Sequence, residues 1–156
     1  MKNDKSQYKL LQKNKKAYFN YEVVEDLECG IALVGTEVKS LREGRFSFAD
    51  SYVTIKDNNL TLVGLHIQPY THGNIHNHAV QRPRRLLAHK QEIKRLRRRV
   101  EEKGFTLIPT SIYLRGNLVK VQISLCRGKK LHDKRATVKE RDLNRDMRRE
   151  IRQMQF

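Results

Sequence analysis

The sequence predicts a mainly antiparallel β fold with helices on its flank, and three observations support this class. Six short segments alternate apolar and polar residues or are rich in β-branched and aromatic side chains, which is typical of strands. Turn-forming residues follow some of these segments at hairpin spacing. Two segments with helical spacing interrupt the series. The six expected strands cover residues 18–24, 29–35, 51–56, 60–67, 105–114 and 118–125.

The last expected strand shows the alternation most clearly. Odd-numbered positions in 119–125 are Val, Ile or Leu, and the even-numbered positions between them are polar. One face of this strand is therefore expected in the core and the other in solvent. The stretches 57–59 (DNN) and 115–117 (RGN) supply Asp, Asn and Gly, which tolerate left-handed backbone angles. They predict two hairpins, and hence antiparallel pairing.

Two helices are expected among the strands. The shorter one covers residues 35–44, with Thr36 as a possible N-cap and Gly44 as its stop. The longer one covers residues 82–104 and ends at Gly104. Its apolar positions at helical spacing are Leu86, Ile93, Leu96 and Val100.

These elements together favour a small closed barrel. Six short antiparallel strands with a helix between the fourth and the fifth are typical of the oligonucleotide-binding (OB) type, in which a curled sheet and its loops recognise nucleic acid. We expect a six-stranded barrel with two to three helices. A chain of 156 residues has the size of one domain. The expected division is a basic N-terminal arm (1–16), the barrel (17–126) and a basic C-terminal tail (127–156).

Positive charge is concentrated in three places. The formal net charge is +16, which favours a polyanionic partner. Residues 1–16 carry a net charge of +5, residues 127–156 one of +6 and residues 82–99 one of +8. Because the signs in 82–99 do not alternate as on a solvated helix face, phosphate binding is the better interpretation of this patch. Arg84, Arg85 and Lys90 are its candidate RNA contacts.

Other classes of site find little support. His72, His76 and His78 have ligand-like spacing, but no cysteine pair accompanies them, so no metal and no cofactor is expected. No phosphate-binding Gly loop, nucleophile setting or paired-carboxylate signature predicts catalysis. No apolar run approaches the length of a membrane span, and the Lys-rich start does not look like a signal peptide. The two cysteines lie far apart, and a reducing cytoplasm is expected.

The tail carries a narrow apolar stripe at helical spacing, made of Leu143, Met147, Ile151 and Met154. Four apolar residues do not offset an ordering cost of about 1–2 kcal/mol per residue. We therefore expect a tail that is disordered in the free protein and folds as a helix, over roughly 136–154, on an RNA surface. A helix that docks on its own barrel is the alternative.

Several motifs, among them GTEVKSLR (35–42) and GKKLHDKR (128–135), resemble those of the small protein B family, the SsrA-binding proteins of bacteria. The resemblance runs in order from about Asn14 to the C-terminus, and GTEVKSLR and GKKLHDKR are its most specific parts. The other matching stretches are NKKAYFNYEV, ECGIALVGTEVKSLREGR, DSYV, HIQPY, RPRRLLAHKQEIKRL and KERD.

This resemblance implies an adaptor for transfer-messenger RNA in trans-translation, the rescue and tagging of stalled ribosomes. The barrel is expected to bind the tRNA-like domain of that RNA. The tail is expected to enter the 16S rRNA decoding centre and the empty mRNA channel of the ribosome. Elongation factor Tu is an expected partner through the aminoacylated transfer-messenger RNA.

The resemblance also implies particular contacts. Glu28, Leu87 and His89 match the family's contacts to transfer-messenger RNA, although Ala88 stands where a third Leu is usual. The matching tail residues are Gly128, Lys129, Lys130, His132, Asp133, Lys134 and Arg135, with His132 as the candidate to stack on a decoding-centre base. Met147 and Ile151 of the apolar stripe complete the expected ribosome-binding surface.

Two other functions stay open on the sequence. A structural ribosomal protein with an OB-type barrel would share the basic ends, and it is the main alternative. An RNA-processing enzyme would need a catalytic constellation, and the sequence offers no specific signal for one. The sequence therefore favours a non-enzymatic RNA-binding adaptor.

Overall fold

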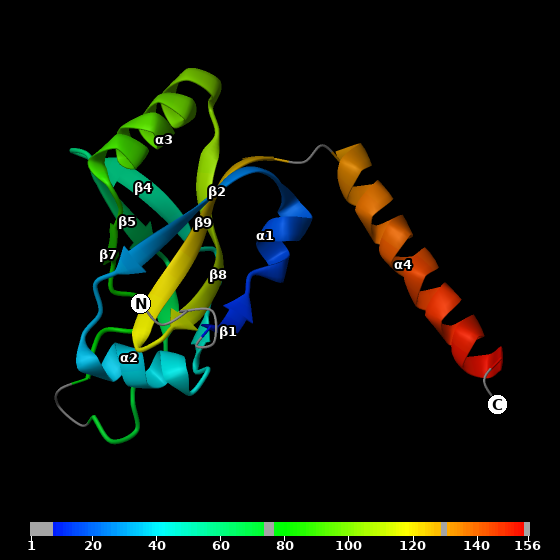
Figure 1. The fold of residues 1–156 in the computed structure, drawn as a ribbon, viewed down its shortest axis with the longest axis horizontal. Helices are drawn as coiled ribbons and strands as arrows, with labels where there is room; N and C mark the ends of the chain where they lie inside the picture. Colours follow the sequence, from blue (N-terminus) through cyan, green and yellow to red (C-terminus); the bar gives the residue numbers. More distant parts are fainter. Residues whose placement is uncertain (1–7, 74–76, 129–130, 155–156) are drawn as a thin grey trace, which may run out of the picture.

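The structure is a computed structural model, and it describes residues 8–73, 77–128 and 131–154. Its strands form a curled sheet with α3 at one end and α2 at the other, while α4 lies apart from the sheet (Figure 1). In chain order the elements are β1 (Tyr8–Lys13), α1 (Lys15–Asn20), β2 (Tyr21–Ile31), α2 (Gly35–Arg42), β3 (Phe46–Ser47), β4 (Tyr52–Lys56), β5 (Asn59–Val63), β6 (His66–Ile67), β7 (Arg84–Leu87), α3 (Lys90–Lys103), β8 (Thr106–Arg115), β9 (Leu118–Gly128) and α4 (Leu131–Met154).

Six of the strands close into a ring. The order in the main sheet is β1-β8-β4-β5-β7-β2-β9, and β8 also pairs with β9. The ring therefore runs β8-β4-β5-β7-β2-β9 and back to β8, with β1 added to β8. Every pairing in it is antiparallel. The predicted six-stranded antiparallel barrel of the OB type is confirmed.

The barrel interior is filled by aliphatic side chains from alternate strand positions. Its fully buried strand residues include Leu60, Leu62, Leu86, Ile112, Ile123 and Leu125. Ile93 and Leu96 of α3 and Leu41 of α2 are buried in the same cluster. Since burying one such side chain contributes about 1.5–3 kcal/mol, this cluster is the main source of stability. The two helices thus close the barrel, one at each end in Figure 1.

Both predicted hairpins are present. Asp57 and Asn58 have φ values of 51° and 60° and join β4 to β5. Two successive residues with positive φ define the turn that matches the twist of paired strands, and Asp and Asn tolerate this conformation. Gly116, with φ of 62°, begins the corresponding turn between β8 and β9.

The helix predicted over 82–104 is wrong in its first part. Residues 84–87 form strand β7, and α3 begins only at Lys90. In β7 Arg84 and Leu86 are buried while Arg85 and Leu87 are exposed, which is the period of a strand. β7 completes the ring between β5 and β2, so sheet pairing overrides the helical spacing. Gly104, with φ of 65°, ends α3 as predicted.

Three other boundaries differ from the prediction. Residues 18–20, expected in a strand, belong to α1, whose N-cap Asn14 accepts a hydrogen bond from the Ala17 N–H. The two strands expected over 18–24 and 29–35 are one continuous strand, β2. The strand expected over 60–67 is divided into β5 and β6 by Gly64, which has φ of 87°.

The two basic ends contain regular structure where they are described. Tyr8–Lys13, expected within the N-terminal arm, pairs with β8 as strand β1. Gly128, expected in the tail, is the last residue of β9 and pairs with Tyr21. Beyond it, α4 extends over Leu131–Met154. That the tail is disordered in the free protein remains a prediction.

Candidate RNA interface

An open hollow brings together three of the predicted RNA contacts. Glu28, Leu87 and His89 line it, with Gly30, Ala88, Glu92 and Lys120, and its volume is about 450 Å³. The register explains the arrangement, because Gly30 of β2 pairs with Leu87 of β7. Glu28 lies two residues before Gly30 on β2 and on the same face, and His89 is the N-cap of α3.

Gly30 gives this hollow its shape. A Cβ atom at position 30 would lie 3.3 Å from the Leu87 Cβ, closer than most such contacts. Glycine therefore lets the Leu87 side chain lie across β2. Leu87 is 53% exposed, which is a high value for a large apolar side chain on a barrel strand. The result is an apolar surface next to the Glu28 carboxylate.

The Glu28 carboxylate is held in place by two side chains of β8. The Tyr113 hydroxyl donates a hydrogen bond to Oε2 of Glu28. Arg115 Nη2 lies 3.0 Å from the same oxygen. Burial, then the neighbouring Glu28, raises the pKa of Tyr113, so its hydroxyl stays protonated and able to donate. Tyr8 of β1 packs on Tyr113 with 4.9 Å between ring centroids.

This geometry suits recognition of nucleotides more than simple charge neutralisation. The contacts of Glu28 with Tyr113 and Arg115 both use Oε2, and the side chain is 35% exposed, so its other oxygen can accept a hydrogen bond from a base or ribose. Leu87 and His89 offer faces against which a base can pack. Lys120, half-buried at the edge of the hollow, supplies a positive charge for phosphate.

Arg84, predicted as an RNA contact, is not at the surface. Its side chain is fully buried and its Nε lies 2.5 Å from Oε2 of Glu37. Its Nη1 donates to the Leu65 carbonyl at 2.7 Å. The prediction is wrong because position 84 faces the interior in the strand alternation of β7, which the expected helix did not show. Arg84 therefore has a structural role.

Glu37 is the centre of this buried network. Located in α2, within the GTEVKSLR motif, it also receives hydrogen bonds from Arg82 Nη2 at 2.5 Å and from the Val34 N–H at 3.0 Å. Burial opposes ionisation of Glu37, yet the hydrogen bonds from Arg82, Val34 and Arg84 hold its pKa below its ordinary value. Sequence reasoning missed this role.

Thr36 is not the N-cap of α2. The N-cap is Val34, and Thr36 lies inside the helix. Its hydroxyl is 2.9 Å from Nδ1 of His78. Nε2 of the same histidine lies 2.9 Å from the Ile67 carbonyl oxygen. His78 thus connects α2 to β6.

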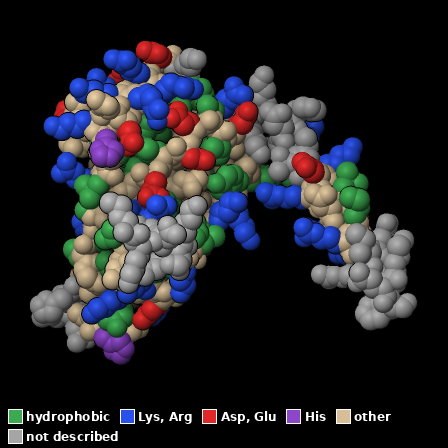
Figure 2. All heavy atoms as spheres, in the orientation of Figure 1, with side chains coloured by type: hydrophobic (Ala, Val, Ile, Leu, Met, Phe, Trp, Pro, Cys, Tyr) green, Lys and Arg blue, Asp and Glu red, His purple; other side chains and the backbone are tan. Residues whose placement is uncertain are grey.

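Most of the other basic residues of the patch are exposed, and several contact residues of the barrel. Arg85 is exposed and donates to the Asn59 side chain at 3.0 Å, and Lys90 is exposed at the start of α3. Arg95 and Arg99 of α3 form ion pairs with Glu25 of β2. Figure 2 shows Lys and Arg side chains gathered over α3. Part of the positive patch therefore also fastens α3 to the barrel.

The predicted tail contacts are described only in part. Gly128 and Arg135 are exposed, and Met147 on α4 is 56% exposed. Lys129 and Lys130 lie outside the described residues. The side chains of His132, Asp133, Lys134 and Ile151 also lie outside the described part of the chain, although their backbone belongs to α4.

The described residues offer little for metal or thiol chemistry. Among them no three His, Cys, Asp or Glu side chains are grouped to hold a metal ion, and His76 is outside the described part. Burial raises the pKa of Cys29 to about 12 and that of Cys126 to about 11. Both thiols are therefore protonated at neutral pH and poor nucleophiles. No helix in the described ranges is both long and apolar enough to cross a membrane.

The closed barrel, the hollow around Glu28 and the basic surface define an RNA-binding protein of the OB type. Comparison with known proteins identifies the family. The family model described as "SmpB protein" matches residues 11–153. The chain therefore belongs to the SmpB family, the SsrA-binding proteins, as the sequence motifs indicated.

Individual relatives agree over nearly the full length. The chain is 53% identical over 149 residues to the SsrA-binding protein of Treponema denticola, covering 96% of this chain and 97% of the relative. It is 48% identical to that of Borreliella burgdorferi, covering 92% and 95%. A chain in the solved structure described as "tmRNA-SmpB: a journey to the center of the bacterial ribosome" is 45% identical, with a TM-score of 0.66 over 77% of this chain and 85% of the other.

Proposed function

We propose that this protein is an RNA-binding adaptor that binds the tRNA-like domain of transfer-messenger RNA and delivers it to stalled ribosomes for trans-translation. Family membership and the likeness to a chain of a transfer-messenger RNA complex on the ribosome support this role. The observation that carries the proposal is the hollow in which Glu28, Leu87 and His89 meet.

The barrel surface around Glu28 receives the RNA in this proposal. Glu28 accepts a hydrogen bond from a base or ribose, and Leu87 and His89 pack against a base. Exposed Arg85 and Lys90 neutralise nearby phosphates. An acidic residue at a proposed RNA-binding site is informative, because phosphate binding alone would not use it. It gives selectivity for an RNA with a donor group at that place.

The tail is the second interface. It enters the decoding centre formed by 16S rRNA and the mRNA channel, where the positive charges of GKKLHDKR meet phosphates and His132 stacks on a base. α4 lies in the channel only when no mRNA occupies it, which restricts the adaptor to stalled ribosomes. The protein itself is non-catalytic. Elongation factor Tu joins through the aminoacylated RNA, and the site of action is the cytoplasm.

The test compares two acidic residues. In filter binding with the isolated tRNA-like domain, Glu28→Ala should weaken binding, whereas Glu43→Ala, at an exposed position next to α2, should not. Both changes raise the net charge equally, so non-specific attraction to RNA rises equally in both variants. His89→Ala should also weaken binding. Retained affinity in Glu28→Ala would overturn the assignment of the hollow.

The RNA captured from cells separates this function from the alternative. One dominant small RNA bound to the full chain supports the adaptor. Stoichiometric ribosomal RNA with no such small RNA would instead indicate a structural ribosomal protein.

A further inference from the structure

Strand β1 is not needed to close the barrel. The ring of six strands is complete without it, and β1 is added to β8 at positions 111–115, beyond the pair of Val53 and Leu107 that joins β4 to β8. β1 therefore covers a part of the β8 edge that β4 leaves open, and unpaired edges are a liability of sheets. Its side chains also cover one particular residue on the outer face of β8.

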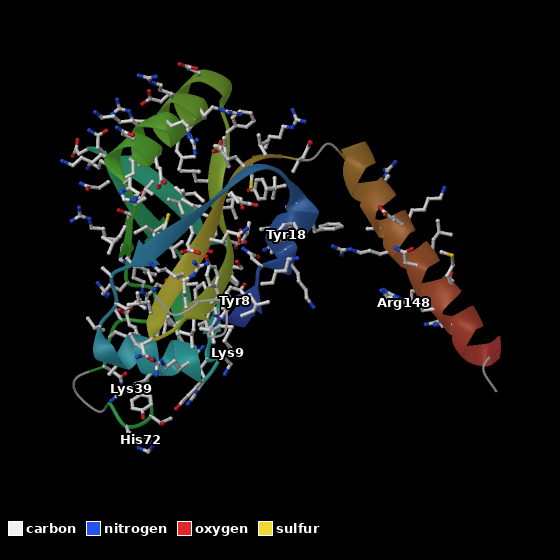
Figure 3. The ribbon with its side chains drawn as sticks, viewed as in Figure 1. Tyr8, Lys9, Tyr18, Lys39, His72 and Arg148 are labelled. Carbon is white, nitrogen blue, oxygen red and sulfur yellow. The ribbon has the colours of Figure 1, made fainter. Side chains whose placement is uncertain are left out.

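That residue is Tyr113. Its neighbour Ile112 is fully buried in the barrel core, so strand alternation directs the Tyr113 side chain to the outer face, yet Tyr113 is only 4% exposed. Tyr8 supplies part of the cover, since its ring packs on the Tyr113 ring with 4.9 Å between the centroids and 43° between the planes. Figure 3 shows Tyr8 beside the barrel. Tyr8 is itself 53% exposed, so it forms the outer layer of this aromatic pair.

The register of β1 fixes this contact. Leu10 pairs with Tyr113 and Tyr8 pairs with Arg115, and diagonal neighbours in such a ladder lie within reach of aromatic side chains. The register shifts after Leu10, which leaves Leu11 as an extra residue, and Leu11 packs against the barrel core. β1 is thereby anchored in its middle. Its first residues lie next to the two residues of β8 that hold the carboxylate of the RNA hollow.

Tyr113 connects β1 to that hollow. Its hydroxyl donates a hydrogen bond to Oε2 of Glu28, and Arg115 Nη2 lies 3.0 Å from the same oxygen. A hydrogen bond is stronger where water is excluded, and Tyr8 excludes water from one side of the Tyr113 ring. A recognition group is held precisely only when the residues behind it are themselves fixed by packing. The position of Glu28 therefore depends on β1, although β1 does not line the hollow.

We propose that Tyr8 is a positioning residue for RNA recognition, which holds the Tyr113 hydroxyl, and through it Glu28, in the geometry that selects the tRNA-like domain. This inference rests on the proposed function. It gives the N-terminal segment, expected from the sequence only as a basic arm, a role that does not depend on charge. Direct stacking of the Tyr8 ring on a base and a purely structural β1 are the competing explanations.

Substitutions at the two tyrosines should have opposite patterns in filter binding of the full chain. Tyr113→Phe keeps the ring but removes the hydroxyl, and it should weaken binding of the tRNA-like domain about tenfold, in the range of one hydrogen bond to a charged group. Tyr8→Phe keeps the ring contact and should bind normally. Tyr8→Ser should weaken binding about threefold, in the range of one aromatic pair.

Two controls accompany these variants. Affinity for an unrelated RNA hairpin of equal length should stay unchanged in all three, because none of the substitutions changes the charge at neutral pH. Tyr70→Ser, in the loop after β6, is the matched tyrosine control and should bind the tRNA-like domain normally. The expected loss is therefore one of selectivity. An equal loss of affinity for both RNAs would overturn the proposal.

Double-mutant cycles with Glu28→Ala separate positioning from direct contact. If both tyrosines act through Glu28, Tyr8→Ser and Tyr113→Phe should cause no further loss of affinity once the carboxylate is absent. An additive effect of Tyr8→Ser would overturn the proposal in favour of direct stacking on a base. Normal affinity of Tyr8→Ser with a lower melting temperature would show that β1 is structural alone.

The same measurements distinguish this inference from the proposed function on which it rests. Full affinity of Glu28→Ala for the tRNA-like domain would overturn both. A weakened Glu28→Ala together with normal binding by Tyr8→Ser would overturn only the role of Tyr8.

Discussion

Some basic residues of the barrel domain are buried or ion-paired, whereas those described between Val138 and Arg149 of the tail are all exposed. In the barrel Arg84 is fully buried against Glu37, and Arg95 and Arg99 form ion pairs with Glu25. In the tail every side chain from Val138 to Arg149 is exposed. Figure 2 shows Lys and Arg spaced along α4, and Figure 3 shows Arg148 well separated from the barrel.

This difference shows that the same residue type carries out different tasks in the two regions. A buried guanidinium costs desolvation, and that of Arg84 is compensated by the Glu37 carboxylate and the Leu65 carbonyl. A guanidinium on α4 stays hydrated and available to phosphate. In the described part of α4, Arg141 lies over the Phe19 ring on α1, 5.7 Å from the ring centroid. The number of basic residues in the barrel domain therefore overstates how many of them are available to bind RNA.

The largest expected effect comes from removing the tail. A chain that ends at Gly128 keeps all of β9, so the barrel should fold and retain most of its affinity for the tRNA-like domain. Tagging on stalled ribosomes should be lost completely, because the proposed second interface is gone. Filter binding and an in vitro tagging assay measure the two properties. Equal loss of RNA affinity and of tagging would contradict separate roles for the barrel and the tail.

Replacing Arg84 should produce the next largest effect. Arg84→Ala leaves Glu37 buried with less compensation, and breaking a buried ion pair in this way costs about 3–5 kcal/mol of unfolding free energy. Arg85→Ala, the adjacent exposed arginine, should change the unfolding free energy by less than about 0.5 kcal/mol. Urea denaturation measures both. A small effect at Arg84 would contradict its assignment to the fold.

The pH dependence provides an internal check on this ion pair. The pKa of Glu37 is lower in the folded protein than its ordinary value. Its ionised form therefore stabilises the fold above the ordinary glutamate pKa, and this contribution disappears as the pH falls through the lower folded value. A Glu37→Gln variant should lack that part of the acid sensitivity in urea titrations.

A proline in α4 tests whether the tail acts as a helix. Met147→Pro should cost about 3 kcal/mol or more of helix stability and abolish tagging, without changing affinity for the isolated RNA domain. Met147→Ala keeps helix propensity and should be much milder. Hydrogen exchange completes the test, since we predict that the tail is unprotected in the free protein. Normal tagging by Met147→Pro would exclude the helical tail as the active form.

The smallest expected effect concerns Arg98. It is exposed, and no ion pair or hydrogen bond of its side chain is found among the described residues, unlike Arg95 and Arg97. If Arg98 neutralises one phosphate, Arg98→Gln should reduce the slope of log K against log salt by about 0.7–0.9. Salt titrations of RNA binding measure this slope. An unchanged slope would mean that Arg98 is merely solvated.

The sequence determined the fold class and the hairpins because these depend on short-range patterns. Period-two alternation gives the buried face of a strand, and residues such as Asp57 and Gly116 set the turn wherever the chain lies. The family motifs also located Glu28, Leu87 and His89, which the register of β2 and β7 then placed in one hollow.

Only the tertiary structure decided which basic residues are buried. The local sequence of residues 82–89 also fits the start of a basic helix. Residues 84–87 form a strand because they pair with β5 on one side and with β2 on the other. That choice turns Arg84 inward to Glu37, 47 positions away in the chain, and leaves Arg85 outside. Partners distant in the chain determine burial and hydrogen bonding, and local composition does not encode them.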